Sequence, residues 1–421
     1  MARYFSSIFF IMLLALAGAR PAAAHNNDPV VLVPGFLGFG PEQFSETGFR
    51  YWGGFDDIVG HMQAGGAHRV MAASIAPIAL NWDRAAELYY QIKGGCVDYG
   101  STHTARHGHR GGVQKPAGKC WAADPANNPE HYPAAFHPAW DAAHPIHLIG
   151  HSQGGTTIRA LIQLLEQGSP NGVEGGGDLY LGGKTGWVSS ATTISAPHNG
   201  TTLRDAVADF PRMAADWAAL IDNFALAAAG PPNPALAGRA GTNSPVADFD
   251  AVQDEMAPDG ARDFNRWALT SPHVVYLSIA TLATEAGAAC CNGTDRFIAP
   301  FQWPSFQYAR DDMMYFCRAT AGESIAPLRL QRGMGSYTQS APGRVKVDRL
   351  WFPNDGVVNT NSMKGPAGHP QRNYNGTALR GTWNFLRTYK GYDHFDILGW
   401  PGAPASAYPV YDRIGAVIYA L

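Results

Sequence analysis

The stretch Ile146-His147-Leu148-Ile149-Gly150-His151-Ser152-Gln153-Gly154 decides the fold of this chain. It joins a short apolar run to residues 156–162, which have helical character. A strand, the pattern Gly-x-Ser-x-Gly and a helix together form the context of a nucleophile elbow, a turn sharp enough to expose the serine at the start of the helix. The positive end of the helix dipole favours negative charge that develops there. The sequence therefore predicts that Ser152 is a nucleophile, against the alternative of an ordinary tight turn.

Apolar runs along the chain predict an α/β fold. Residues 29–34 form a continuous, largely β-branched run, which is typical of a strand buried on both faces of a mainly parallel sheet. Helix-like stretches, such as residues 82–93 and 156–167, lie between several such runs. This alternation predicts a mostly parallel central sheet flanked by helices, in one catalytic domain over residues 25–421. Similar runs occupy residues 70–75, 146–149, 189–195, 274–279 and 344–350.

The N-terminus has the pattern of an export signal. Arg3 precedes an apolar run at residues 8–17, and Ala22-Ala23-Ala24 offers a cleavage site, so residues 1–24 are predicted to be a signal peptide. The apolar run is too short to span a bilayer comfortably. The formal net charge of −3 and the scattered basic residues argue against a nucleic-acid partner. We expect a secreted protein, extracellular or periplasmic, with no obligate protein partner.

The chain contains five cysteines, which in an exported protein predict disulfides with one thiol left over. Cys96 and Cys120 could close one loop. Cys317 could pair with either Cys290 or Cys291.

A serine hydroxyl becomes a nucleophile only when a histidine, itself held by a carboxylate, accepts its proton. In the α/β-hydrolase chain order the acid and then the histidine follow the serine. His394, in a near-C-terminal segment, is the predicted base, and His369, in a stretch rich in proline and glycine, is the alternative. The histidines that follow Ser152 are His198, His273, His369 and His394.

The acid and the oxyanion donors are predicted from strand ends. Asp355 lies in a Phe-Pro-Asn-Asp-Gly turn that follows the strand-like residues 345–350, although such a turn can also form without chemistry. A tetrahedral oxyanion needs backbone donors already in place. We expect these donors to be the N–H groups of Gln153, after the nucleophile, and of Phe36, in the loop after the first strand. Gly35 permits close approach there.

Motifs spread in order over residues 29–400 resemble those of the zinc-containing Bacillus-type and staphylococcal lipases, which are α/β-hydrolases. The resemblance implies that Ser152, Asp355 and His394 match the catalytic triad and that Phe36 and Gln153 match the oxyanion hole. The reaction it implies is ester hydrolysis of acylglycerols. The motifs are PGFLG at 34–38, YWGG at 51–54, NWDRA at 81–85, GGCVDYG at 94–100, PHNGT at 197–201 and NDG at 354–356.

The resemblance also implies a structural zinc ion held by two aspartates and two histidines. Taken alone, the histidine-rich residues 103–109 are more typical of a solvated loop. Carboxylate and neutral imidazole at four tetrahedral corners suit Zn²⁺, and such a closed site would fasten an insertion at about residues 81–143 without holding a catalytic water. The predicted ligands are Asp83, His103, His109 and Asp250, with Asp248 as the alternative to Asp250.

Members of that family also bind a structural Ca²⁺ near the catalytic histidine. Asp396 matches one carboxylate position of the calcium site, whereas Pro401 stands at the position of a second. Because Ca²⁺ requires several oxygen ligands, the sequence predicts only part of a calcium site.

An apolar stripe at helical spacing follows the PHNGT motif. Such a stripe is typical of an amphipathic helix, and a helix buried in the core is its usual explanation. Its position matches that of the family's lid, which we therefore expect at about residues 203–230, covering the acyl pocket in water and exposing its apolar face to lipid. The stripe consists of Phe210, Met213, Trp217, Leu220, Ile221 and Phe224.

These observations predict a secreted triacylglycerol lipase that acts at a lipid or other insoluble ester interface. A short-chain carboxylesterase, a polyester hydrolase or an acyltransferase on the same scaffold is the alternative with the same chemistry. A non-enzymatic surface-binding module would be expected to have a broken triad, and here all three positions are intact.

Overall fold

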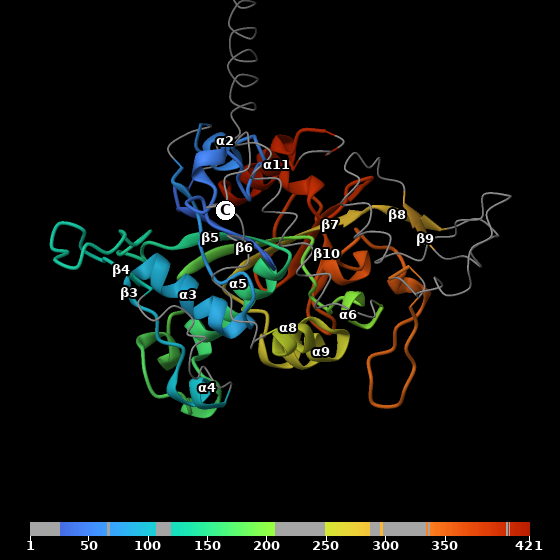
Figure 1. Cartoon of the computed structure of the whole chain (residues 1–421), viewed down its shortest axis with the longest axis horizontal. Coiled ribbons are helices and arrows are strands. Elements are labelled where there is room, and N and C mark those ends of the chain that lie inside the picture. The colour runs from blue at the N-terminus through green and yellow to red at the C-terminus, as the bar shows by residue number, and fades with distance from the viewer. Residues whose placement is uncertain are drawn as a thin grey trace, which may run out of the picture.

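The computed structural model describes residues 26–64, 68–106, 119–206, 249–286, 295–297, 334–335, 337–400, 403 and 405–421. A seven-stranded sheet with the order β10-β11-β7-β6-β5-β1-β2 forms its centre (Figure 1). All neighbouring strands in this sheet are parallel. The predicted α/β class with a mostly parallel central sheet is therefore confirmed.

The strands of the central sheet are β1 (Val30–Val33), β2 (Val70–Ala72), β5 (Ile146–His151), β6 (Val188–Ile194), β7 (Val275–Leu282), β10 (Gln371–Asn373) and β11 (Trp383–Lys390). Two small antiparallel pairs are β3 (Gly95–Cys96) with β4 (Cys120–Trp121), and β8 (Thr284–Ala286) with β9 (Asp295–Phe297). The α-helices of the described residues are α2 (Ile58–Ala64), α3 (Asn81–Lys93), α4 (Ser101–Arg106), α5 (Gln153–Gln167), α6 (Leu203–Ala206), α8 (Phe249–Met256), α9 (Pro258–Trp267) and α11 (Tyr408–Ile418).

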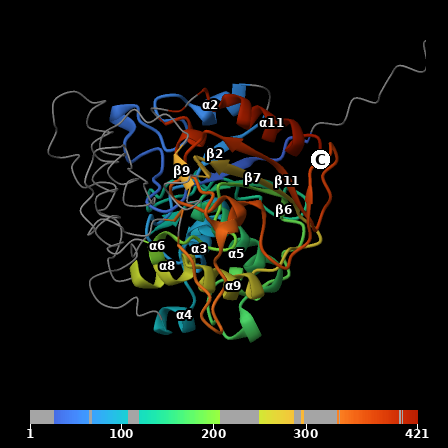
Figure 2. The same cartoon turned by 90° about the vertical axis from the view of Figure 1, so that its right-hand side faces the viewer.

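Helices cover both faces of the sheet, with α2 and α11 on one side and α3, α5 and α9 on the other (Figure 2). Strand β1 shows why, because alternate side chains of a strand point to opposite faces. Val30 and Leu32 belong to the apolar cluster of α2 and α11, whereas Val31 and Val33 belong to the cluster of α3 and α5. All four side chains are fully buried. The prediction from the continuous apolar run at residues 29–34, a strand buried on both faces of the sheet, is therefore confirmed.

The prediction of a strand at residues 344–350 is wrong. A single bridge joins Gln339 to Val347, and the 3-10 helix η7 (Arg349–Trp351) follows at once. The carboxylate of Asp348 caps η7, so the chain turns away where an extended run would have continued. Valines alternate with charged residues in this run, which is the pattern of a half-buried strand. Among the described residues, however, the run forms only the single bridge and no strand ladder.

Strands β10 and β11 lack the apolar pattern that predicts the others. The sequence of β11 is WNFLRTYK, in which polar residues interrupt the apolar ones. It nevertheless pairs with β7 along its length, with a bulge between Phe385 and Arg387. Tertiary pairing therefore overrides local composition at this side of the sheet.

The disulfide between Cys96 and Cys120 is confirmed and joins β3 to β4. The other three cysteines lie outside the described residues, as do the predicted signal peptide and the six residues of the apolar stripe between 210 and 224. Within the part of the chain that the structure describes, no helix is long and apolar enough to cross a membrane.

Candidate active site

Ser152 occupies the turn between β5 and α5. Its backbone lies at φ 55° and ψ −130°, a region that a residue with a side chain rarely adopts. Glycine is required on both sides because of close backbone approach. A Cβ on Gly154 would lie 2.2 Å from the Val33 oxygen, and one on Gly150 would lie 2.4 Å from the Gly154 oxygen. The local geometry is that of the strained elbow which the sequence predicts.

Asp355 and His394 form a buried pair, with 2.7 Å between Oδ2 and Nδ1. Oδ2 also accepts from the Thr281 hydroxyl at 2.7 Å, and Oδ1 accepts from the backbone N–H groups of Val357 and Val358 at 3.0 and 2.8 Å. Four donors thus hold this carboxylate in one orientation. Because an ionised carboxylate only accepts hydrogen bonds, Nδ1 of His394 carries the proton and Nε2 is left as the acceptor.

The loop that carries Asp355, here called the acid loop, is positioned by the end of β7 and not by a preceding strand. The Ala283 N–H donates to the Asn354 oxygen at 2.9 Å, and the Asn354 N–H donates to the Thr284 hydroxyl at 3.1 Å. The backbone N–H of His394 donates to the backbone oxygen of Asp355 at 3.0 Å. Asp355 stays the predicted acid, but the end of β7 supports it and not the strand that the sequence suggested. Thr281 was missed, since an isolated threonine late in a strand carries no sequence signal.

Two loops contact the elbow at Ser152: the loop after β1, here called the oxyanion loop, and the loop that carries His394, here called the histidine loop. A Cβ on Gly35 would lie 2.6 Å from the Cβ of Ser152, which places the Gly35-Phe36 peptide beside the nucleophile. Nε2 of His151 lies 2.9 Å from the backbone oxygen of His394, and their ring centroids are 4.6 Å apart. Gln153 is the first residue of α5 and is fully buried. The predicted oxyanion donors and the predicted base therefore meet at the same end of the sheet.

The alternative base, His369, belongs to a different place. Its Nδ1 bonds to the Thr270 hydroxyl at 2.7 Å and its Nε2 to the Asn265 oxygen at 3.0 Å, and burial lowers its pKa. Both ring nitrogens are therefore engaged away from Ser152, and the structure favours His394 as the base.

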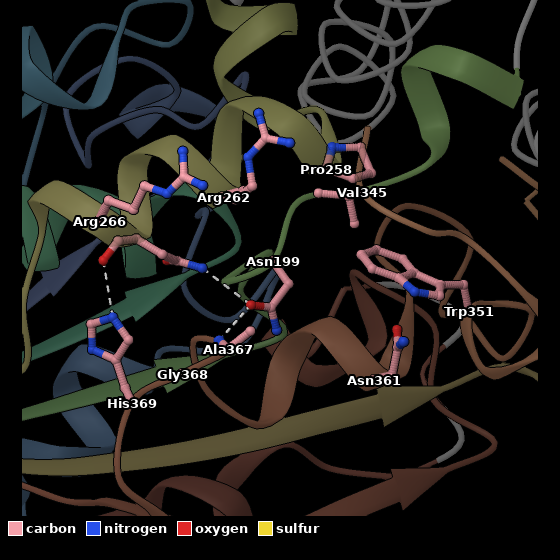
Figure 3. A pocket seen from close by; sticks show the side chains of 11 residues that line it. Asn199, Pro258, Arg262, Arg266, Val345, Trp351, Asn361, Ala367, Gly368 and His369 are labelled. Carbon is pink, nitrogen blue, oxygen red and sulfur yellow. Dashed lines mark hydrogen bonds between the residues drawn. The ribbon is translucent and has the colours of Figure 1, made fainter. Parts of the chain in front are cut away.

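His369 lines a cavity of about 540 Å³ beside α9 (Figure 3). Asn199 also lines the cavity, and its side-chain oxygen accepts from the Ala367 N–H and from the Asn265 amide. Trp351 closes another side. None of the predicted triad lines this cavity, which is distinct from the candidate active site.

Two of the four predicted zinc ligands lie together. Oδ1 of Asp83, in the first turn of α3, is 2.8 Å from Nε2 of His103 in α4, and both side chains are buried. Asp250 lies in α8, whose Glu255 accepts from the Asn81 N–H at 2.8 Å, so this helix adjoins the start of α3. His109 is outside the described residues, among which no group of three or more His, Cys, Asp or Glu side chains could hold a metal ion.

Asp396, the predicted calcium ligand, holds its own loop. Its Oδ2 accepts from the Asp393 N–H at 2.7 Å, and Oδ1 of Asp393 accepts from the Asp396 N–H at 2.9 Å. These bonds shape the turn that follows His394.

A parallel sheet with a nucleophile elbow after a central strand, and a buried Asp–His pair at the same edge, define the α/β-hydrolase class. Residues 26–214 match the family model for the lipase-like C-terminal domain. The lipase of Staphylococcus epidermidis is 29% identical over 403 residues, which cover 90% of this chain and 51% of that protein. The lipase of Staphylococcus hyicus is 28% identical over 410 residues, which cover 90% and 55%.

Solved structures agree with these relatives. EstA from Clostridium botulinum matches with a TM-score of 0.73 and 29% identity, covering 96% of this chain and 90% of that one. The lipase of Staphylococcus hyicus matches with a TM-score of 0.67 and 25% identity, covering 94% and 97%. The chain is therefore similar to the staphylococcal lipases, as the motifs predict. It spans about half the length of the curated relatives it matches.

The Asp355–His394 pair predicts how fast Ser152 reacts with a fluorophosphonate. We expect Asp355→Asn to slow covalent labelling of Ser152 by about a thousandfold, because an amide can offer N–H to His394 and stabilise the wrong tautomer. Mass spectrometry of the adduct over time measures the rate. Asp348→Asn, which changes a partly exposed acid outside the site, is the matched control, and equal rates in the two variants would contradict the assignment.

Proposed function

We propose that this chain is a triacylglycerol lipase that hydrolyses carboxylic esters of acylglycerols at a lipid surface. The observation that carries the proposal is the elbow serine with a buried, four-donor Asp355 bonded to His394 at the same sheet edge. The similarity to proteins named lipases supports the choice of acylglycerols among esters.

In the proposed mechanism, Nε2 of His394 accepts the hydroxyl proton of Ser152 while Oγ attacks the ester carbonyl. Asp355 holds the imidazole in the tautomer that makes Nε2 basic and stabilises the imidazolium that forms. The carbonyl oxygen becomes an oxyanion, which the N–H groups of Phe36 and Gln153 bind. His394 then gives its proton to the departing alcohol.

The acyl-enzyme is hydrolysed by the same groups in reverse. His394 takes a proton from water, whose oxygen attacks the acyl carbonyl, and the second oxyanion uses the same two backbone donors. Collapse of this intermediate returns the proton to Ser152 and releases a carboxylic acid. No step requires a metal ion, so the proposed metal is structural.

We propose a structural zinc ion at the Asp83–His103 pair. The donor set fits, because a buried carboxylate and a buried imidazole from two separate helices are ligands that Zn²⁺ prefers. His109 and Asp250 would complete the site. Asp396 alone supports calcium, so the proposal includes zinc only.

We also propose that the chain is exported. The pattern of residues 1–24 supports a signal peptide, and the disulfide between Cys96 and Cys120 suits an oxidising compartment. The apolar stripe at residues 210–224 would serve as the lid over the acyl pocket.

Ser152→Ala tests the proposed activity. We expect wild type to hydrolyse emulsified trioleoylglycerol and dissolved tributyrin, and the variant to lose both activities by at least about a thousandfold, since the nucleophile is absent. Titration of released fatty acid measures the rates, and Ser169→Ala, which changes a buried serine just beyond the opposite end of α5, is the control. Cleavage of tributyrin alone would favour the short-chain esterase, and unchanged activity in Ser152→Ala would refute the mechanism.

Zinc content tests the metal proposal independently of activity. We expect about one zinc per chain in wild type and little in Asp83→Asn or His103→Ala after dialysis, since a missing ligand weakens a closed tetrahedral site strongly. The melting temperature should fall with the zinc content. His144→Ala removes an exposed histidine and should keep the metal. Equal zinc in all four proteins would place the ion elsewhere.

A further inference from the structure

Three buried hydrogen bonds connect the three segments of the candidate active site. The Gly35 N–H donates to the Tyr51 hydroxyl at 2.8 Å, and this hydroxyl lies 2.7 Å from Nδ1 of His151. Nε2 of His151 lies 2.9 Å from the backbone oxygen of His394. Tyr51 is 4% exposed and His151 is fully buried. The oxyanion loop, the elbow and the histidine loop are therefore joined through two side chains.

The chemistry of the groups fixes the donor and the acceptor in each of these three hydrogen bonds. A backbone oxygen only accepts, so Nε2 of His151 must carry the proton that it donates to His394. Nδ1 of the neutral ring is then an acceptor, and the Tyr51 hydroxyl donates to it. The lone pairs of that hydroxyl remain to accept from Gly35. The direction of all three hydrogen bonds is thus fixed, and a reversed pattern would leave a buried group unsatisfied.

Burial also fixes the charge of both side chains. It raises the pKa of Tyr51 above the ordinary value, and it lowers the pKa of His151 well below the ordinary value. Both side chains are therefore neutral near neutral pH. Because neither group titrates there, the bonding pattern persists through the catalytic cycle.

The position of these bonds explains what they can do. Gly35 precedes Phe36, the expected oxyanion donor, and its Cα has no room for a side chain because Ser152 and Tyr51 are too close. The bond that the Gly35 N–H donates to Tyr51 therefore fixes the Pro34–Gly35 peptide, which directly precedes the peptide that carries the Phe36 N–H. The bond from His151 fixes the backbone of His394 relative to the residue before Ser152.

We propose that Tyr51 and His151 are positioning residues that hold the Phe36 donor and the His394 base in register with Ser152. The inference rests on the proposed ester hydrolysis and adds two residues to it. Packing alone does not require these polar groups, because a phenylalanine at position 51 would fill nearly the same space without a buried hydroxyl. Their hydrogen bonds serve geometry, which catalysis needs to within a fraction of an ångström.

Tyr51→Phe is the main test, with Tyr276→Phe as its matched control. Tyr276 is equally buried, and its hydroxyl likewise accepts from a backbone N–H, that of Ser271 at 3.1 Å, but at the opposite end of β7. We expect Tyr51→Phe to lower kcat for p-nitrophenyl butyrate by about 10- to 100-fold with KM changed less than about threefold. The control should keep kcat within about twofold. A folded Tyr51→Phe enzyme with wild-type kcat would overturn the inference.

A transition-state analogue separates positioning from general loosening of the structure. We expect the inhibition constant of an alkyl trifluoromethyl ketone, which forms an oxyanion on Ser152, to rise by the same factor as kcat/KM falls in Tyr51→Phe. An unchanged inhibition constant alongside a reduced kcat would contradict a role in the oxyanion hole. Ser152→Ala is measured in parallel. Activity that survives in Ser152→Ala refutes the proposed function itself, whereas loss of its activity together with a wild-type kcat in Tyr51→Phe refutes only this inference.

His151 provides a second test that does not depend on Tyr51. Glutamine can offer both an N–H donor and an oxygen acceptor, whereas leucine offers neither. We therefore expect kcat to fall in the order wild type, His151→Gln, His151→Leu, with at least about tenfold between the two variants. A packing role predicts that leucine is tolerated as well as glutamine in this buried position, and that result would overturn the proposal.

Discussion

The constraint on which the structure depends is the close contact between the elbow and the end of β1. Gly154 lies so near the backbone oxygens of Val33 and Pro34 that no side chain fits between them. This contact lets α5 start directly beneath the loop after β1 and forces Ser152 into its strained backbone conformation. Ser152 and the loop after β1 are therefore brought together by backbone packing before any side chain is considered.

Parallel strand order supplies the rest of the site. The carboxyl ends of β1, β5, β6 and β7 meet at one edge of the sheet, because parallel neighbours run in the same direction. The acid loop is bonded to the end of β7 and the histidine loop is bonded to the acid loop. Segments hundreds of residues apart in sequence thus become neighbours, and Tyr51 and His151 join them with hydrogen bonds of defined direction.

Much of this arrangement could be predicted from the sequence, and the exceptions have physical reasons. Continuous apolar runs identified β1, β5, β6 and β7, because strands buried on both faces need apolar residues throughout. They missed β11, in which polar residues interrupt the apolar ones, and wrongly suggested a strand at residues 344–350. Chain order pointed to Asp355, which the structure places against His394. The contacts of Thr281 and Tyr51 cross the fold and leave no local pattern in the sequence.

The most direct test of the account is the structure of the chain with Ser152 phosphonylated by an ester analogue. The account predicts that the phosphoryl oxygen lies within about 2.7–3.1 Å of the N–H nitrogens of Phe36 and Gln153. It also predicts that His394, still bonded to Asp355, faces the serine oxygen through Nε2. An adduct whose phosphoryl oxygen points to solvent, or a His394 turned away from Ser152, would contradict the claim that these segments form one site.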